Sequence, residues 1–379
     1  MNIGIVCYPT YGGSGVIATE LGKSLALRGH KVHFITYSRP IRLGHFTKDI
    51  TFHEVSVADY PLFEFPPYES ALASTLVDVA QYHDIDLFHV HYAIPHASAG
   101  ILARNILKEM GRIVPVITTL HGTDITLVGK SKVYEPVVAW SINHSDGTTA
   151  VSDWLRQETN SALSITTPIE VIPNFVDLER FQRQDKEHFR KMVASNNEKI
   201  IIHTSNFRKV KRVEDVILAY QRIKKDVPSK LLMIGDGPER PRVEELCREL
   251  NLCNSIVFLG YQNPVEEIYS IADLFLMPSA SESFGLSALE VMACGVPCIT
   301  SNAGGLPEVN LDGKTGFVCE IGDTDCMGEK AVELLRDDAL WQKFSRQARS
   351  TAEEYSIDKI VPLYETYYQK VLKSAKSLV

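Results

Sequence analysis

Short apolar runs alternate with longer amphipathic segments along the first half of the chain. The runs are nearly continuous in Val, Ile and Leu, as expected for parallel strands covered on both faces. Helices are predicted between them, for example over 16–28, which ends before the favourable C-cap residue Gly29, and over 97–110. The predicted strands are NIGIVCY from Asn2, KVHFITY from Lys31, LFHVHY from Leu87, PVITTL from Pro115 and GTTAV from Gly147.

The same alternation restarts after a proline-containing linker, IEVIPNFVDLERF, and a charged stretch that ends at Lys199. Two such series predict an α/β protein with two doubly wound, Rossmann-like domains facing a central cleft, where ligands bind at strand ends. We expect the domains at 1–168 and 169–356, with a terminal helix at about 357–379 packing back on the first. The second series of strands is KIIIHT from Lys199, KLLMIG from Lys230, SIVFLG from Ser255, DLFLMP from Asp273 and PCIT from Pro297.

Composition narrows the class of protein. The 379 residues carry a formal net charge of −8, which argues against a nucleic-acid binder or a polybasic membrane protein. No apolar run approaches the roughly 18 residues that span a bilayer, and the first residues lack the features of a signal peptide, so we expect a cytoplasmic protein. The seven cysteines are odd in number and form no Cys-x-x-Cys, which favours small core residues over a disulfide framework or a zinc knuckle.

A glycine-rich segment, YGGSGV, follows the first predicted strand and opens the first helix. Gly12, Gly13 and Gly15 permit positive φ and close backbone approach, and a helix N-terminus attracts anions. The spacing is not Gly-x-Gly-x-x-Gly, and no acid follows about 20 residues later, which disfavours a dinucleotide site. The segment is therefore either an anion-binding loop or only a tight strand–helix turn.

Two further motifs follow strands of the second series. FRKVKR at 207–212 supplies the countercharge that a diphosphate needs, although a solvated loop or, less favoured, a nucleic-acid patch has the same composition. GDGPER at 235–240 has the residues of a turn that leads into a helix, which favours a structural role.

The segment ESFGLSALE places Glu282 in a loop and Glu290 early in a helix that begins near Gly285. The backbone N–H groups of 284–287 are candidates to bind phosphate, and Glu290 to accept hydrogen bonds from vicinal hydroxyls. In the alternative interpretation Glu290 compensates the helix dipole and Glu282 faces solvent.

Three histidines lie near strand ends. His89 and His91 are expected on the same side of one strand, and His121 follows another. A metal cluster is conceivable, but no standard spacing such as His-Glu-x-x-His is present. Hydrogen-bonded histidines are therefore the favoured interpretation, and no metal is predicted.

These motifs occur together in one order, and that combination resembles the retaining glycosyltransferases of family four, which have the GT-B fold. The joint match covers nearly the whole chain, although each motif is short. It consists of Gly12–Gly15, HGTD at 121–124, IPNFVD at 172–177, GDGP at 235–238, the pair Glu282 and Glu290, AGGLPE at 303–308 and DGKTGF at 312–317.

The resemblance implies roles for individual residues. Glu290 binds the ribose hydroxyls, Glu282 binds hydroxyls of the donor sugar, and Lys211 neutralises the diphosphate. The family has an Arg five residues before this Lys, where this chain has Asn206, and Arg208 is the candidate replacement. The implied catalytic residues are Lys211, Arg208, His121 and Glu282, and the implied nucleotide-sugar residues are Gly15, Asn206, Lys211, Tyr261, Glu282, Ser283, Phe284, Gly285, Leu286 and Glu290.

A narrower match lies in CYPTYGGSGVIATELG, ITYSRP and HVHYAIPHA. These segments resemble family members that transfer N-acetylglucosamine from UDP-N-acetylglucosamine to the hydroxyl of L-malate, the first step of bacillithiol biosynthesis. The resemblance implies small-molecule substrates, no cofactor or metal, no nucleic acid and no membrane insertion, and it leaves self-association open. The implied acceptor-binding residues are Gly12, Gly13, Ser14, Tyr92, Thr123 and Arg156.

Three other functions fit the same architecture. A family-four transferase with another small acceptor would keep every donor residue. A UDP-N-acetylglucosamine 2-epimerase would need no acceptor, and the pair Glu282 and Glu290 disfavours it. A degenerate transferase that only senses a nucleotide sugar is disfavoured by the joint presence of Lys211, Glu282 and Glu290.

Overall fold

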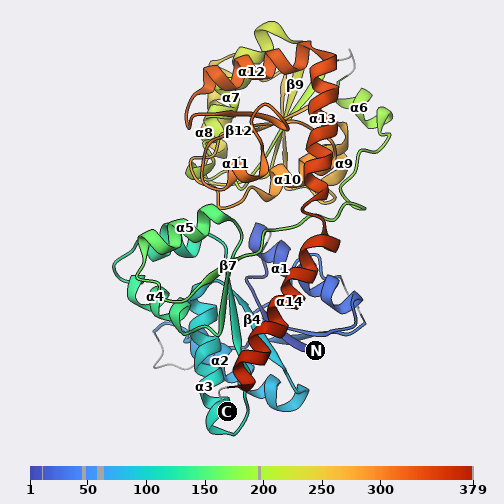
Figure 1. Cartoon of the computed structure of the whole chain (residues 1–379). Coiled ribbons are helices and arrows are strands. Elements are labelled where there is room, and N and C mark those ends of the chain that lie inside the picture. The colour runs from blue at the N-terminus through green and yellow to red at the C-terminus, as the bar shows by residue number, and fades with distance from the viewer. Residues whose placement is uncertain (11, 45–47, 58–63, 195–197, 378–379) are drawn as a thin grey trace. The chain divides into compact units, whose positions relative to one another are not determined.

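The computed structural model describes residues 1–10, 12–44, 48–57, 64–194 and 198–377, so Tyr11 of the glycine-rich segment lies outside the described residues. It divides into two compact units, one of Met1–Asn174 with Asp358–Val379 and one of Phe175–Ile357 (Figure 1). The first unit extends past residue 168 because the strand Ile169–Val171 pairs with its neighbour in the first sheet.

The sheet of the first unit has seven parallel strands in the order β3-β2-β1-β4-β5-β6-β7. Its central strands are buried along their whole length, as the continuous apolar runs predict. The strands are β1 (Asn2–Val6), β2 (Lys31–Thr36), β3 (Ile50–Glu54), β4 (Leu87–His91), β5 (Val116–Leu120), β6 (Gly147–Ala150) and β7 (Ile169–Val171).

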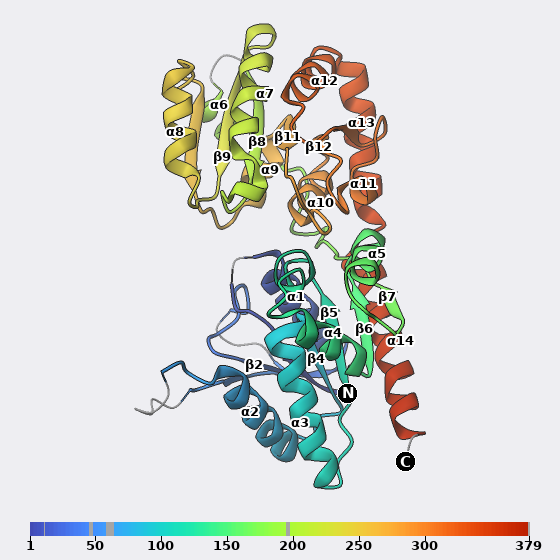
Figure 2. The ribbon, with the colours of Figure 1, turned by 90° about the vertical axis from the view of Figure 1, so that its left-hand side faces the viewer.

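Helices cover this sheet, and α2 and α3 pack side by side against it (Figure 2). The first helix ends before Gly29, whose φ of +88° completes the predicted C-cap. The helices and helical turns are α1 (Gly13–Leu27), α2 (Tyr68–His83), η1 (Ala93–Ala97), α3 (Ser98–Glu109), η2 (Asp124–Gly129), α4 (Glu135–His144), α5 (Asp153–Ala162) and the terminal α14 (Ile357–Lys376).

The terminal helix α14 packs on the first unit. The Tyr368 hydroxyl lies 2.7 Å from Nδ1 of His89, and the Tyr367 hydroxyl donates to the Thr148 carbonyl at 3.2 Å. Glu365 pairs with Arg28 at 2.8 Å. Residues far apart in sequence therefore complete one core.

The sheet of the second unit has six parallel strands in the order β10-β9-β8-β11-β12-β13. They are β8 (Lys199–Thr204), β9 (Ser229–Ile234), β10 (Ile256–Gly260), β11 (Leu274–Met277), β12 (Cys298–Ser301) and β13 (Gly316–Cys319). The helices are α6 (Glu187–Val193), η3 (Lys209–Lys211), α7 (Val213–Asp226), α8 (Arg240–Glu249), α9 (Glu266–Ile271), α10 (Leu286–Ala293), α11 (Leu306–Val309), α12 (Thr324–Arg336) and α13 (Asp338–Glu353).

Both sheets are doubly wound, which confirms the predicted fold class. In each, the chain first builds strands toward one edge and then returns to build toward the other. The reversal falls between β1 and β4 in the first unit and between β8 and β11 in the second. Ligands of open α/β sheets bind at the carboxyl ends of strands at such a reversal.

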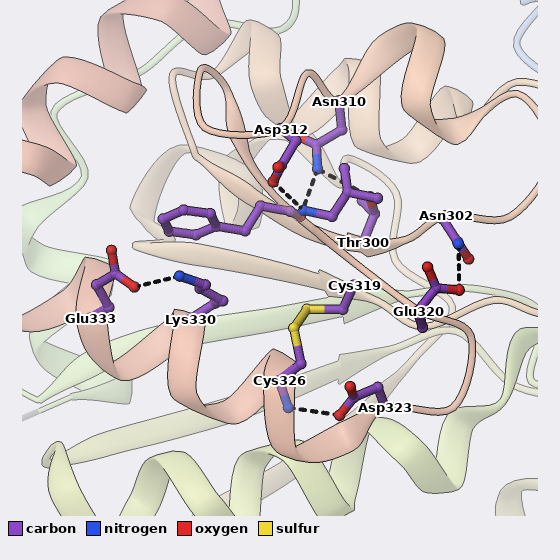
Figure 3. The surroundings of a disulfide bond; sticks show 12 residues. Thr300, Asn302, Asn310, Asp312, Cys319, Glu320, Asp323, Cys326, Lys330 and Glu333 are labelled. Carbon is purple, nitrogen blue, oxygen red and sulfur yellow. Dashed lines mark hydrogen bonds and ion pairs between the residues drawn. A yellow bond between two sulfur atoms is a disulfide. The ribbon is translucent and has the colours of Figure 1, made fainter.

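One expectation about the cysteines is wrong. Cys319, at the end of β13, forms a disulfide with Cys326 in the first turn of α12, with Cα atoms 6.1 Å apart (Figure 3). Asp323 caps the same turn by accepting from the Cys326 N–H at 2.8 Å. A strand end and a helix start meet here only through folding, so the spacing of seven residues carried no signal. Four other cysteines are buried as predicted, namely Cys7, Cys247, Cys294 and Cys298.

Within the described ranges, no helix is both long enough and apolar enough to cross a membrane.

Candidate active site

The basic segment of the second unit forms a loop with a short helical turn after β8. Phe207 is fully buried with a φ of +32°, and Arg212 has a φ of +49° at the start of α7. Between them the short helix η3 presents Lys211, whose side chain is only 20% exposed. Burial of Phe207 anchors the loop and so fixes where Lys211 emerges.

A buried hydrogen-bond chain supports this loop from below. Nδ1 of His203 lies 2.9 Å from the Leu276 carbonyl and must donate to it, so Nε2 accepts from the Ser205 hydroxyl at 2.8 Å. Burial lowers the pKa of His203 to about 4, and the ring is neutral at pH 7. The Ser205 oxygen also accepts from the Phe207 N–H at 3.3 Å. Strand β11 is thereby linked to the basic loop.

The Gly-Asp-Gly-Pro motif packs directly on the same loop. A Cβ on Gly235 would lie 1.8 Å from the Ser205 carbonyl oxygen, and one on Gly237 would lie 2.2 Å from that of Asn206. The Glu239 N–H donates to the Phe207 carbonyl at 2.9 Å. Glycine is required here for contact between two loops, which is a structural role.

Glu282 is held in the loop that follows β11. Its carboxylate accepts from the Ser279 hydroxyl at 3.1 Å, and its carbonyl accepts from the Gly305 N–H at 2.9 Å. A Cβ on Gly304, which has a φ of +58°, would lie 1.9 Å from that carbonyl oxygen. The AGGLPE segment therefore supports Glu282 from the loop after β12.

Lys211 and Glu282 form an ion pair across the reversal between β8 and β11. The Glu282 side chain is 12% exposed, so both charges are largely removed from water. A second contact joins the same two loops, because the Ala280 N–H donates to the Val210 carbonyl at 2.8 Å. The sheet thus brings together two predicted residues that lie 71 positions apart in sequence.

Helix α10 begins beside Glu282. Gly285, with a φ of +97°, stands at the N-cap and, as a glycine, provides no side-chain cap. The backbone N–H groups at the start of a helix attract anions. Glu290 lies in the second turn with only 8% exposure. Phe284 is buried and packs edge-to-face on Tyr355, with centroids 5.7 Å apart.

The other predicted donor residues lie on the surface of these loops. Asn206 and Arg208 are exposed in the basic loop, and the Arg208 carbonyl accepts from the Lys211 N–H at 2.8 Å. Tyr261 is 65% exposed after β10, and its hydroxyl donates to the Asp236 carbonyl at 3.2 Å. Ser283 lies between Glu282 and Phe284 and is half-buried.

In the first unit the glycine-rich segment is mostly helix, since α1 begins at Gly13. Neither Gly12, Gly13 nor Gly15 has a positive φ, so that part of the expectation is wrong. The expected close approach of the backbone is present, because a Cβ on Gly15 would lie 2.5 Å from the Tyr8 carbonyl oxygen. Tight packing of the helix start on the preceding loop leaves no room for a side chain.

Three predicted acceptor residues meet at the reversal between β1 and β4. The Tyr92 hydroxyl donates to Oγ of Ser14 at 2.9 Å, and the Thr123 hydroxyl donates to the Tyr92 oxygen at 3.3 Å. Tyr92 has a φ of +85°, an unfavourable value for a non-glycine residue. The first turn of α1 and the loops after β4 and β5 are thereby joined through hydroxyl groups.

The histidines behind this group are neutral, and the rings of His91 and His121 are stacked. Nδ1 of His91 lies 2.8 Å from Nε2 of His121, and His89 lies 2.6 Å from the Thr119 hydroxyl. Burial lowers the pKa of His89 and of His121 to about 3, and that of His91 far below its usual range. Hydrogen-bonded histidines are what the structure shows. Among the described residues, no group of three or more His, Cys, Asp or Glu side chains is arranged to hold a metal ion.

Arg156 belongs to another element. It lies in α5 and pairs with Asp153 in the first turn of that helix. The Ser152 hydroxyl caps α5 by accepting from the Leu155 N–H at 3.1 Å. These contacts tie Arg156 to its own helix and do not join it to Tyr92.

Several supporting residues had no role in the sequence-based interpretation. Asp124 was part of a recognised motif without a function, and His203 lies unnoticed inside a strand. Ser279 and Ser301 form a relay, in which the Ser301 hydroxyl donates to the Ser279 carbonyl at 2.5 Å and Ser279 donates to Glu282. Each of these residues is polar and lies in or near a strand that is otherwise apolar, and that pattern could have identified them from the sequence.

Family models match both halves of the chain. The family described as Glycosyltransferase Family 4 matches residues 11–180, and the family described as Glycosyl transferases group 1 matches residues 184–351. The N-acetyl-alpha-D-glucosaminyl L-malate synthase of Bacillus anthracis is 45% identical over 379 residues, covering 100% of this chain and 99% of the relative. A GDP-mannose-dependent mannosyltransferase of phosphatidylinositol monomannoside from Mycolicibacterium smegmatis is 28% identical, over 71% of this chain and 72% of its own.

Solved structures share the fold. Sucrose-phosphate synthase from Thermosynechococcus elongatus has a TM-score of 0.83 at 19% identity, over 99% of this chain and 100% of its own. The Anabaena protein Alr3699/HepE in complex with UDP-glucose has a TM-score of 0.81 at 19% identity, with full coverage of both chains.

Proposed function

The chain belongs to the family-four glycosyltransferases, and on that premise we propose that it transfers N-acetylglucosamine from UDP-N-acetylglucosamine to the hydroxyl of L-malate. The product is N-acetyl-α-D-glucosaminyl L-malate, the first intermediate of bacillithiol biosynthesis. Support for these substrates comes from the Bacillus anthracis relative, whose name states the same product and whose whole length aligns.

The observation that carries the proposal is the pair of Lys211 and Glu282 beside the start of α10. UDP gains negative charge as its bond to the sugar breaks, and preorganised cations and N–H dipoles stabilise such charge. The Lys211 ammonium has three donors, so it can bind Glu282 and a phosphate oxygen together. We infer that Arg208 adds charge from the same loop, in place of the Arg that Asn206 replaces.

Binding of the donor would use both carboxylates as acceptors. Glu290 receives the ribose hydroxyls and Glu282 the sugar hydroxyls, while the backbone around Ser283, Phe284, Gly285 and Leu286 holds phosphate and sugar oxygens. Supporting this, Glu290 is buried within the first two turns of a helix whose N-cap residue is Gly285. We assign Tyr261 and Gly15 to further contacts with the nucleotide sugar.

Malate brings two carboxylates, which need hydrogen-bond donors. The hydroxyls of Ser14, Tyr92 and Thr123 lie together at the carboxyl ends of the first sheet, beside the N-terminus of α1. That helix start, with Gly12 and Gly13, offers free N–H groups and a partial positive charge. We assign the malate carboxylates to this group, with His121 facing the reacting hydroxyl and Arg156 as a further cation.

The chemistry follows a front-face substitution. The bond between the sugar C1 and the UDP oxygen breaks as the malate oxygen bonds to C1 on the same face, and the hydroxyl proton passes to the leaving phosphate. Glu282 is committed to Lys211 and Ser279 by its contacts, which suits a binding group better than a nucleophile. Protein cations carry the countercharge, so we propose that the reaction needs no metal. We also propose that it takes place in the cytoplasm.

A UDP-release assay tests the proposal. UDP-N-acetylglucosamine is incubated with L-malate, D-malate, an inositol phosphate or a simple sugar, each with and without a chelator. The expected result is release that depends on L-malate and is insensitive to chelation. Release with another acceptor alone would assign a different transferase, and conversion of the donor without any acceptor would support the 2-epimerase alternative.

A further inference from the structure

Asp124 is the most buried carboxylate beside the Ser14–Tyr92–Thr123 group, with 2% exposure at the start of η2. One of its oxygens accepts from the Gly122 N–H at 2.8 Å and from the His121 N–H at 3.3 Å. The other accepts from the Ala93 N–H at 3.3 Å. A single side chain therefore holds backbone amides of two different loops.

These two loops carry the acceptor residues assigned above. The Ala93 amide belongs to the peptide that follows Tyr92, a residue whose φ of +85° is disfavoured and persists only where its surroundings hold it. On the other side, Asp124 fixes the His121–Gly122 turn, in which Gly122 has a φ of +113°. The Thr123 hydroxyl then reaches the Tyr92 oxygen at 3.3 Å.

We propose that Asp124 is a positioning residue for the acceptor, which sets the loop of Tyr92 and the loop of His121 and Thr123 in register. The inference rests on the proposed function only in placing the acceptor at this end of the first unit. It adds a residue for which the family resemblance implied no role.

The chemistry of the carboxylate explains why Asp is needed. A deprotonated carboxylate accepts on both oxygens, whereas an Asn amide has one oxygen and one NH₂ group. In an Asp124→Asn variant the NH₂ group would face either the Ala93 N–H or the Gly122 N–H, and that buried N–H would lose its partner. Unpaired buried donors are costly, so one of the two loops would move.

Protonation gives the role a measurable signature. Burial raises the pKa of Asp124 to about 6, even though the N–H groups of Gly122, Ala93 and His121 oppose the shift. As pH falls through that value, the Asp124 carboxylate gains a proton and one of its oxygens becomes an O–H donor. One of the backbone N–H groups then loses its acceptor, and the link between the two loops weakens. The ionisable groups that face this site do not titrate in that range: the pKa of His121 is lowered to about 3 and that of His96 to about 4, that of Tyr8 is raised to about 12, and His91 stays neutral.

The test compares Asp124→Asn with Asp146→Asn. Asp146 is a matched control, because it also accepts from a backbone N–H, that of Val116 at 2.8 Å, but at the opposite end of β5. For Asp124→Asn we expect the KM for L-malate to rise about 10- to 100-fold, with kcat reduced less and UDP affinity by calorimetry unchanged. The control should keep its malate KM within about twofold of wild type.

The pH profile separates positioning from general destabilisation. The wild-type kcat/KM for malate should fall on the acid side with an apparent pKa near 6, while UDP affinity stays flat. The Asn variant should lack this limb. A malate KM and a profile that match wild type in Asp124→Asn would overturn the role, and if that variant does not fold, a wild-type profile without the limb would do the same. If the wild-type protein is inactive with malate but active with another acceptor, only the proposed acceptor is refuted. The Asp124 variants are then compared with that other acceptor.

Discussion

At the scale of single residues, the candidate donor site depends on one ion pair and the groups that hold it. Lys211 is fixed by a buried aromatic anchor and Glu282 by a serine relay from the next strand. The pair is therefore already formed in the structure, and a phosphate bound beside it would meet an oriented ammonium. Preorganisation of this kind avoids reorganisation during the reaction.

Replacing Lys211 with Ala should lower kcat by about 10²–10³, the usual scale for losing one charge-stabilising donor. Lys209→Ala is the matched control, because Lys209 lies in the same helical turn with an exposed side chain. Steady-state UDP release measures both. Near-normal turnover in Lys211→Ala, or an equal loss in both variants, would remove Lys211 from the mechanism.

Glu290→Ala should weaken UDP binding about 10- to 100-fold, because hydrogen bonds from the ribose hydroxyls to a buried carboxylate are lost. Calorimetric titration with UDP alone measures this. Glu282→Ala is the comparison, since it should reduce affinity for the whole nucleotide sugar more than for UDP. Unchanged UDP affinity in Glu290→Ala would refute the ribose role.

At the scale of elements, glycines allow neighbouring loops to touch. Gly235 and Gly237 bring the loop after β9 against the basic loop, and Gly304 brings the loop after β12 against Glu282. Each contact lies at the carboxyl edge of the second sheet. The site is therefore shaped by backbone packing between loops as much as by the side chains that line it.

Gly304→Ala should both destabilise the protein and lower its activity, because the new Cβ would collide with the Glu282 carbonyl oxygen. Gly313→Ala is the control: its φ of +67° is equally unfavourable, but nothing lies within 4 Å of its Cβ. We expect a loss of about 1–2 kcal/mol for Gly313→Ala with normal turnover, and a larger loss with at least about tenfold lower kcat for Gly304→Ala. Equal melting temperatures and equal rates would contradict this account.

Strand prediction succeeded for the central strands and for the edge strand β10, and it was incomplete at the other edges. The central strands appear as apolar runs because helices cover both faces. Strands β3 and β7 were missed, since β3 has no fully buried residue and β7 has only three residues. Strand β13 was noted only as part of the motif DGKTGF. Edge strands are defined by their partners in space, which a single segment does not reveal.

At the scale of the whole molecule, the two units repeat one plan. Each is a doubly wound sheet whose reversal point gathers polar loops, one around Lys211 and Glu282 and the other around Tyr92. The units differ in their buried ionisable groups. The first contains most of the buried neutral histidines, so pH should act on the two units unequally.

The protein should lose stability as pH falls from 7 to 5. Each buried histidine is neutral in the folded protein, whereas in the unfolded chain it binds a proton below about pH 6.5. The free energy of unfolding therefore falls by about 1.4 kcal/mol per histidine for each further pH unit. Asp124 has the opposite effect: because its pKa is raised in the folded protein, it adds stability as pH falls from about 6 to about 4. The histidines outnumber it: the pKa is lowered to about 4 for His33, His96 and His203 and to about 3 for His89 and His121.

Calorimetric melting from pH 7.5 to 5 measures this effect. All of these histidines except His203 belong to the first unit, so the first unit should lose more stability than the second. A His96→Gln variant should show a shallower dependence on pH. A melting temperature that stays constant or rises toward pH 5 would contradict the assignment of neutral histidines.

Local patterns in the sequence were enough to predict the fold class, and they pointed to the candidate donor loops. Strand periodicity predicted two doubly wound sheets, and short local motifs named Lys211, Glu282 and Glu290, because a loop or a helix start is encoded by adjacent residues. Which distant groups meet depends on how the chain folds. The ion pair, the disulfide between Cys319 and Cys326, and the three amides held by Asp124 all join separate segments, and the order of strands in each sheet brings those segments together.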